Sequence, residues 1–171
     1  PALSAGWVAF AFFAIGFGLA IGGLICSTFH LGHPERALKA FTQWRSSWLS
    51  REAVVAVAAL SIMGLYAFLL IFFDTRIAAL RCPGAALPPF TVFATSMIYM
   101  QLRTVPRWNH WSPPVLFLGY AVAGGTLLAG QIPAAIALLL AVGAVQTIAW
   151  FDQERRESAS DTDLATATGL G

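Results

Sequence analysis

Charged residues are scarce in this sequence. Asp, Glu, Lys and Arg make up 11% of the 171 residues, whereas a soluble domain carries about 25%. Lysine occurs once, and the net charge of +2 is too small to indicate an acidic partner. Apolar residues reach 58% of the chain. This composition excludes a secreted disulfide scaffold, a disordered tail and a nucleic-acid-binding module, and it is typical of a membrane protein.

Cysteine is also rare, because the sequence contains only Cys26 and Cys82. Two cysteines cannot ligate an iron–sulfur cluster. The membrane spans predicted below place these two near opposite faces of about 30 Å of hydrocarbon, so they cannot form an intramolecular disulfide. No zinc-ligand spacing, phosphate-binding glycine loop or nucleophile elbow is present either. We therefore expect no catalytic group and no metal site in this chain. Any redox chemistry then needs a partner subunit or a diffusible carrier.

Long uncharged runs predict five membrane spans. A helix needs about 20 apolar residues to cross the hydrocarbon core. Pro83, Pro88 and Pro89 predict an irregular entrance to the third span, and Gly130 with Pro133 predicts the break between the last two. We expect an all-α, polytopic transmembrane helix bundle. Its predicted spans are residues 5–29, 53–73, 90–102, 114–131 and 133–151.

The pattern of charge predicts the domain organisation and the orientation. Residues 1–151 form the transmembrane helical domain, with an interfacial segment at about 30–52, and residues 152–171 form a solvated tail. The first loop, the third loop and the tail share one face and hold eight of the ten basic residues. The positive-inside rule assigns that face to the cytoplasm and predicts a multi-pass protein of the inner membrane. Docking of another subunit is an alternative use for these arginines.

The connection between the first two spans holds the most informative residues. Pro34 predicts the start of a short helix along the membrane surface. Ser50 is predicted to be the N-cap of the second span, which puts Glu52 in its first turn, where the helix dipole favours a carboxylate. The apolar face of this segment is predicted to consist of Leu38, Phe41, Trp44 and Trp48.

The histidines leave several interpretations open. His30 can be an imidazole that closes the first span at the lipid–water boundary, or a redox or ligand-binding group, since ionisable residues at membrane depth are commonly functional. A haem held by two histidines is a third interpretation. His30 and His33 are too close in sequence to flank one haem, and His110 could pair with them only across loops.

Three blocks of sequence resemble the membrane-anchor subunits of dimethyl sulfoxide reductase-type molybdoenzymes. They are Phe29-His-Leu-Gly-His-Pro-Glu-Arg-Ala37, Ser47-Trp-Leu-Ser-Arg-Glu52 and Tyr99-Met-Gln-Leu-Arg-Thr-Val-Pro-Arg-Trp108. The run from Thr42 to Glu52 is most similar to anchors of quinone-linked sulfite dehydrogenases. Members of this family usually have eight spans, so the resemblance implies that this chain corresponds to spans two to six.

The resemblance implies a subunit without its own haem or metal that binds menaquinone or ubiquinone. The quinone site would lie near the face where an iron–sulfur subunit docks, and electrons would move between quinone, iron–sulfur clusters and a molybdopterin centre in a third subunit. His30 and Glu52 match the family's quinone-site positions, Arg36 and Arg45 are expected to orient Glu52 or the docked subunit, and an aromatic pair is expected to line the pocket. The implied quinone-binding residues are His30, Glu52, Arg36, Arg45, Tyr99 and Trp108.

The chemistry of the residues agrees with this expectation. Quinone interconversion moves two electrons and two protons, so its pocket needs a polar group for the ring oxygens and a proton route to water. An imidazole, whose ordinary pKa is about 6.5, suits the first role for His30, and a carboxylate suits the second for Glu52. Two other hypotheses remain. One is a b-type cytochrome anchor, and the other is a transporter or a purely structural membrane subunit.

Overall fold

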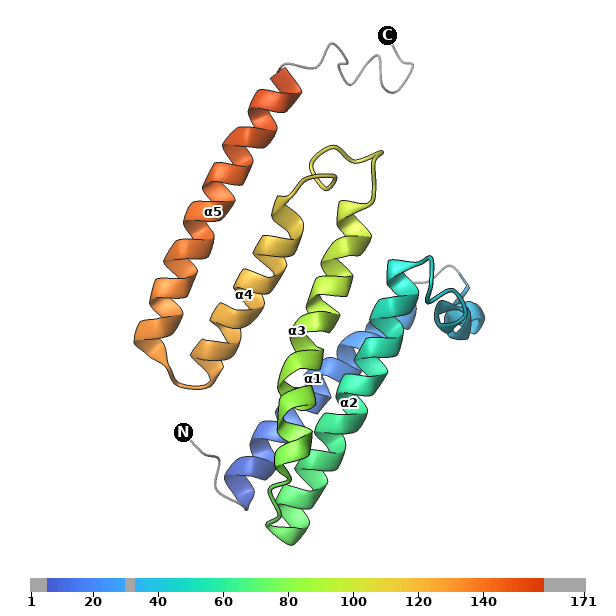
Figure 1. The fold of residues 1–171 in the computed structure, drawn as a ribbon, viewed down its shortest axis with the longest axis vertical. Coiled ribbons are helices and arrows are strands. Elements are labelled where there is room, and N and C mark those ends of the chain that lie inside the picture. The colour runs from blue at the N-terminus through green and yellow to red at the C-terminus, as the bar shows by residue number, and fades with distance from the viewer. Residues whose placement is uncertain (1–5, 30–32, 159–171) are drawn as a thin grey trace. The chain divides into compact units, whose positions relative to one another are not determined.

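The computed structural model describes residues 6–29 and 33–158, with the main chain alone at 34–36 and 157–158 (Figure 1). All the regular structure within these residues is helical, which confirms the predicted all-α class. In chain order the elements are α1 (Trp7–Phe29), a 3₁₀ helix η1 (Pro34–Phe41), α2 (Trp48–Phe73), α3 (Ala78–Met100), α4 (Ser112–Leu128) and α5 (Ile132–Ser158).

Three of the described helices are long and apolar enough to cross a membrane. They are Trp7–Phe29, Trp48–Phe73 and the stretch Ile132–Arg156 of α5. Helix α4 is apolar but has only 17 residues. Large apolar side chains are exposed on the helices, including Trp7 at 85% and Leu128 at 81%. Such a surface is unfavourable in water and suits lipid, so the chain is a polytopic helical membrane protein.

Helix α3 corrects one prediction. The irregular entrance expected at Pro83, Pro88 and Pro89 is absent, because all three prolines lie inside the continuous helix Ala78–Met100. The fixed φ of proline suits a helix, and each ring removes one backbone hydrogen bond. In a membrane the remaining backbone groups must still be paired within the segment, and packing against neighbouring helices helps to accommodate the missing bonds. The helix therefore continues through the prolines instead of unwinding.

The chain divides into two compact units, Pro1–Ile98 and Tyr99–Gly171. In the first unit, α1 and α2 pack through a cluster of Ala9, Phe13, Ala67 and Leu70. Phe13 meets Tyr66 edge to face, with ring centroids 6.3 Å apart. Helix α3 contacts α2 at the N-terminal end of α2. There the Trp48 and Phe93 rings lie 5.8 Å apart, also edge to face.

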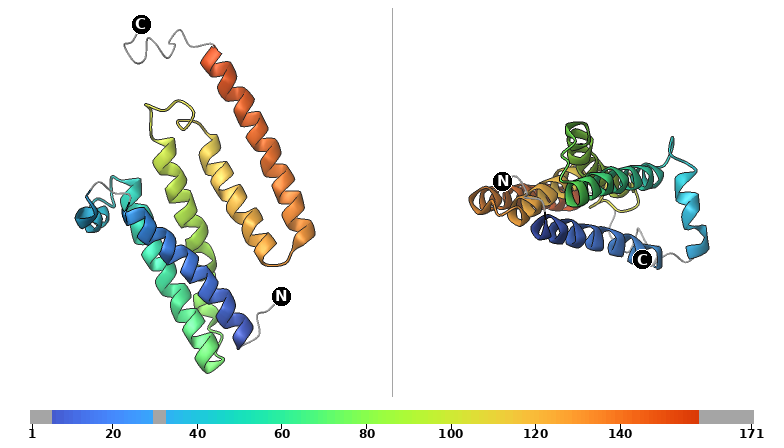
Figure 2. Two further views of the ribbon diagram at one scale, coloured as in Figure 1. Left: turned by 180° about the vertical axis from the view of Figure 1, so that it is seen from behind. Right: turned by 90° about the horizontal axis from the view of Figure 1, so that it is seen from below.

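The segment η1 runs across the end of α2 rather than along it (Figure 2). Its predicted start at Pro34 is confirmed, but it is a 3₁₀ helix and ends at Phe41. Leu38 is 78% exposed, and Phe41 and Trp44 are exposed as well. The placement of this segment along the membrane surface stays a prediction.

In the second unit, α4 and α5 form a hairpin (Figure 1). The predicted break is confirmed, because Gly130 takes a φ of +74° and its N–H donates to the Leu127 carbonyl at 2.9 Å. Close packing occurs at Gly119, where an added Cβ would lie 2.6 Å from Cγ2 of Val142. Helix α5 continues past the apolar run to Ser158, so the first residues of the expected tail are helical. Residues 159–171 lie outside the described part.

Candidate functional site at the start of helix α2

Ser50 fastens the loop after η1 to helix α2. Its hydroxyl donates to the Ala40 carbonyl and accepts the N–H of Gln43 at 3.2 Å. The prediction that Ser50 is the N-cap is therefore wrong. Helix α2 begins three residues earlier than predicted, at Trp48, with Ser47 at the N-cap position. The last turn of η1 and the loop after it fold back over this turn, so their main chain supplies the partners that the Ser50 side chain binds.

Arg51 forms a second link to the same loop. Its Nε donates to the Trp44 carbonyl at 3.1 Å, and its Nη2 donates to the Arg45 carbonyl at 2.6 Å. The guanidinium also lies 4.4 Å from the centroid of the Trp48 ring. A planar guanidinium can make these contacts at once because its donors form a rigid fork. In the sequence, Arg51 contributed only to the predicted membrane orientation, and this anchoring role was missed.

Glu52 lies in the second turn of α2, directly after these two anchoring residues. The first turn contains no acidic residue, so the predicted interaction of Glu52 with the first-turn dipole is wrong. Its side chain is half-buried, and its Oε1 accepts a hydrogen bond of 2.5 Å from Oγ1 of Thr95 on α3. Thr95 Oγ1 is also 3.0 Å from the Thr91 carbonyl. Thr95 was missed from sequence, although two threonines four residues apart in an apolar span mark one polar helix face.

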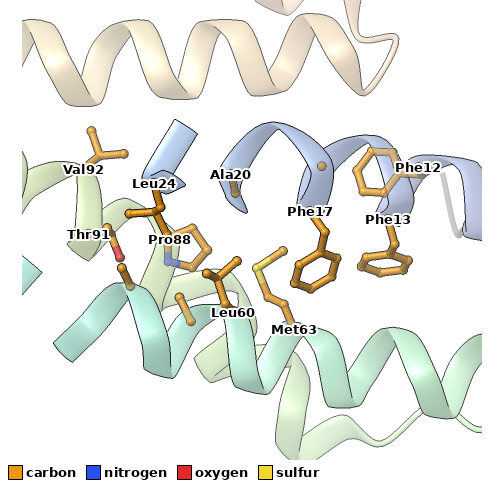
Figure 3. Close-up of a pocket in the computed structure, with 13 residues that line it drawn as sticks. Phe12, Phe13, Phe17, Ala20, Leu24, Leu60, Met63, Pro88, Thr91 and Val92 are labelled. Atoms are coloured by element: carbon orange, nitrogen blue, oxygen red, sulfur yellow. The ribbon is translucent and has the colours of Figure 1, made fainter. Parts of the chain in front are cut away.

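An apolar cavity of about 360 Å³ begins one helical turn deeper than the Glu52–Thr95 pair. Ala56 of α2 and Thr91 of α3 line its near end, each four residues from a member of the pair. Figure 3 shows Phe13 and Phe17 of α1 pointing toward Leu60 and Met63 of α2 across this space. The cavity therefore lies among α1, α2 and α3 and is bounded mostly by hydrocarbon. Its full lining is Phe12, Phe13, Gly16, Phe17, Ala20, Leu24, Ala56, Ala59, Leu60, Met63, Pro88, Thr91 and Val92.

The other predicted site residues fall in different places. His30 lies outside the described residues, directly after the last residue of α1. Arg36 belongs to η1, where only the main chain is described. Arg45 is exposed in the turn after η1, with its guanidinium 5.7 Å from the Trp44 ring centroid. Its carbonyl accepts a hydrogen bond from Arg51, so Arg45 belongs to the anchored loop, residues 42–47, which Ser50 and Arg51 of α2 hold against that helix.

Tyr99 and Trp108 belong to the second compact unit. Their rings meet edge to face at 5.2 Å, and Tyr99 also packs 5.5 Å from Phe117 of α4. The two predicted aromatic residues are thus brought together, and they order the connection between α3 and α4. Their contribution to a quinone pocket stays a prediction.

A second polar cluster surrounds His110, which the sequence suggested only as a haem ligand. The imidazole is almost fully buried, with Nε2 2.8 Å from Oδ2 of Asp152 and Nδ1 2.8 Å from Oγ of Ser112. The backbone N–H of Ser112 donates to Nδ1 at 3.3 Å. Nδ1 is therefore the acceptor nitrogen, and we assign the ring proton to Nε2, which donates to Asp152.

Comparison with known proteins identifies the family. The family model of the DMSO reductase anchor subunit (DmsC) matches residues 6–151, which is most of the chain. The chain belongs to this anchor-subunit family. The resemblance is thereby confirmed, and it extends from α1 to residue 151 of α5.

One curated relative supports the same assignment. A sulfite dehydrogenase subunit from Allochromatium vinosum is 34% identical over 144 residues, which cover 73% of this chain and 44% of that protein. The chain thus spans less than half the length of this relative. No solved structure matches the chain significantly.

Proposed function

We propose that this chain is the membrane anchor of a molybdopterin oxidoreductase complex and binds quinone or quinol at Glu52. Membership of the DMSO reductase anchor family and similarity to a sulfite dehydrogenase subunit support the anchor role. In this proposal the chain exchanges electrons with an iron–sulfur subunit that docks on the face carrying η1. The catalytic molybdopterin centre belongs to a further subunit. This chain itself contributes quinone binding and proton transfer.

The observation that carries the quinone site is a half-buried carboxyl above an apolar cavity. Glu52 bonds Thr95, and the cavity of about 360 Å³ continues from the next turn of both helices. A quinone has a polar ring and an apolar isoprenoid tail, so it needs polar and apolar surfaces that adjoin each other. We place the ring at the Glu52 end and the tail along the cavity.

The anchored loop explains how Glu52 can act on such a ring. Oxidation of a quinol to the quinone releases two electrons and two protons, and reduction takes up the same number. Glu52 accepts or returns a proton at Oε1 or Oε2, while the electrons pass to or from the iron–sulfur subunit. Ser50 and Arg51 hold the first turn of α2 against η1 and the loop after it, which fixes the turn that precedes Glu52. A carboxyl on a fixed turn is positioned for proton transfer. In this proposal His30, which follows α1, provides the second polar group for the ring.

The test compares quinone-coupled activity with activity toward an artificial electron carrier that bypasses the membrane subunit. In the intact complex, we expect Glu52→Gln and His30→Ala to lower quinone-coupled turnover by about 10²-fold or more, the scale of a lost acid–base group. Activity with the artificial carrier should be unchanged, and all subunits should still co-purify. Glu154→Gln is the matched control, because Glu154 is an exposed carboxylate on α5.

Two results would contradict the proposal. The first is unchanged quinone-coupled turnover in both the Glu52→Gln and the His30→Ala variants. The second is equal loss of both activities together with loss of the other subunits, which would show that these residues serve assembly.

A further inference from the structure

The Thr95 hydroxyl faces two acceptors but carries one hydrogen. Its Oγ1 lies 2.5 Å from Oε1 of Glu52 and 3.0 Å from the carbonyl of Thr91. A hydroxyl has one donor and two acceptor lone pairs, so Thr95 can donate to only one of these oxygens at a time. Both Glu52 and Thr95 are half-buried, and the cavity beside them is lined mostly by hydrocarbon. The direction of this hydrogen bond therefore depends on the proton of Glu52.

Both protonation states of Glu52 find a partner in Thr95. An ionised carboxylate only accepts hydrogen bonds, so it takes the hydrogen of Thr95. A protonated carboxyl can donate to Oγ1, and the threonine hydrogen then turns to the Thr91 carbonyl, which is already within reach. Oε1 of Glu52 and Oγ1 of Thr95 therefore stay paired with each other in both states. This matters because a half-buried polar group that loses its partner is destabilised.

We propose that Thr95 is the positioning residue of Glu52 in quinone conversion. It holds the carboxyl toward α3 and reverses its own hydrogen bond each time Glu52 gains or loses a proton. The inference rests on the proposed function, since it assumes that Glu52 exchanges protons with the quinone. It adds a residue from α3 to a proposed site whose other members on this side of Tyr99 are His30, Arg36 of η1 and Arg45 of the loop before α2.

A purely structural role for Thr95 predicts different behaviour. Thr126 and Thr147 also donate to carbonyls four residues earlier, at 2.7 Å and 2.8 Å. Such bonds satisfy the hydroxyl of a helical threonine without any function. Thr95 differs because its hydroxyl also reaches a carboxylate on another helix. Thr126→Val is therefore a matched control that removes the common bond alone.

The experiment uses the intact complex and four variants: Thr95→Val, Thr95→Ser, Glu52→Gln and Thr126→Val. Valine has nearly the shape of threonine without the hydroxyl, whereas serine keeps the hydroxyl. We expect Thr95→Val to lower kcat for quinone-coupled turnover about tenfold, with KM changed less than about threefold. Thr95→Ser and Thr126→Val should retain nearly full turnover. Activity with the artificial electron carrier should stay unchanged in all of them.

The double variant Glu52→Gln with Thr95→Val gives a readout that packing alone would not produce. If Thr95 acts through Glu52, its substitution should add little once the carboxylate is gone. A further loss in the double variant, or equal losses for Thr95→Val and Thr95→Ser, would overturn the inference. If Thr95→Val has no effect while Glu52→Gln impairs turnover, the inference fails and the proposed function stands. If neither impairs turnover, both fail.

Assembly of the complex provides the final check. Should Thr95→Val fail to co-purify with the other subunits, Thr95→Ala and Thr95→Ser form the comparison, because they differ by one hydroxyl. Loss of quinone turnover in the alanine variant alone supports the inference. Failed assembly of the alanine variant would assign Thr95 a structural role instead.

Discussion

His110 joins the start of α4 to the end of α5 through Asp152, which lies 42 residues later in the chain. Nε2 of the buried imidazole is 2.8 Å from Oδ2 of the carboxylate. Gln153 adds a bond from its Nε2 to the Arg107 carbonyl at 3.1 Å, and another to Oγ of Ser112 at 3.3 Å. Deeper between α4 and α5, the described residues meet through hydrophobic contacts and a Tyr120–Gln146 hydrogen bond. The His110 cluster is thus the main polar link at the open end of the hairpin.

Removing the imidazole should destabilise this hairpin. We expect His110→Ala to lower the free energy of unfolding by about 1–3 kcal/mol, because the buried Ser112 hydroxyl loses the acceptor of its hydrogen and keeps only the bond from Gln153. Thermal and denaturant unfolding in detergent micelles would measure the change. Arg156→Ala is the control, since it removes only the exposed ion pair to Asp152 (3.3 Å) and should have a clearly smaller effect. Equal effects of the two substitutions would contradict the role assigned to His110.

Close packing between Gly119 and Val142 predicts that substitutions at these two positions have coupled effects on stability. An added Cβ would lie 2.6 Å from Cγ2 of Val142, so Gly119→Ala must move that valine or separate the helices. We expect a loss of about 1–3 kcal/mol in unfolding free energy, recovered in part by Val142→Ala in the same protein. Gly124→Ala, on the same helix with nothing within 4 Å of its added Cβ, should be close to neutral. If the unfolding free energies of the two single variants and the double variant are additive, the Gly119–Val142 contact is not the cause of the loss.

The fork of Arg51 should control the order of the loop after η1. Arg51→Gln removes the bonds to the Trp44 and Arg45 carbonyls, so the amides of residues 42–47 should exchange hydrogen faster. Hydrogen–deuterium exchange with mass spectrometry measures this directly. Ser46→Ala is the control in the same loop, because it removes only an exposed 3.4 Å bond to Gln43. Unchanged exchange in the Arg51 variant would show that the loop is held by other contacts.

A large side chain in the cavity should weaken the binding of long-tailed quinones more than that of short-tailed ones. Ala20 lines the cavity from α1, so Ala20→Phe should raise KM for a long-tailed quinone severalfold and leave a short-tailed analogue nearly unaffected. Ala11→Phe places the same side chain on α1 outside the cavity lining and should change neither KM. Quinone-coupled kinetics with the two substrates measure the difference. An equal effect on both quinones would contradict the tail placement.

The distribution of arginines predicts the orientation of the chain. In a background without Cys26 and Cys82, a cysteine at Ser46 should react with an impermeant thiol reagent only from the cytoplasmic side. A cysteine at Thr75, exposed between α2 and α3, should react only from the opposite side. Labelling of intact cells and of inverted membrane vesicles distinguishes the two faces. If the Ser46→Cys variant is labelled in intact cells, the predicted orientation is wrong and η1 lies outside the cytoplasm.

Much of the fold was predictable from local features of the sequence. Long uncharged runs can satisfy their backbone only as helices in lipid, so the five α-helices followed from composition and length, although α3 begins at Ala78 rather than at the predicted residue 90. Gly130 predicted the turn between α4 and α5 because its positive φ suits glycine. The three prolines of α3 led to the wrong prediction of an irregular entrance. A prediction from local sequence includes the missing hydrogen bonds but not the surroundings that favour an uninterrupted helix.

The candidate site was only partly predictable. The sequence by itself singled out Glu52 and the loop before it, because these blocks resemble the anchor-subunit family and because a carboxylate can transfer protons. The pairing of Glu52 with Thr95 and of His110 with Asp152 was decided by tertiary structure alone. Both pairings depend on how far each helix is rotated about its axis and shifted along it. Helices that are apolar on most sides carry too few polar residues to specify that rotation, so packing between them determines which side chains meet.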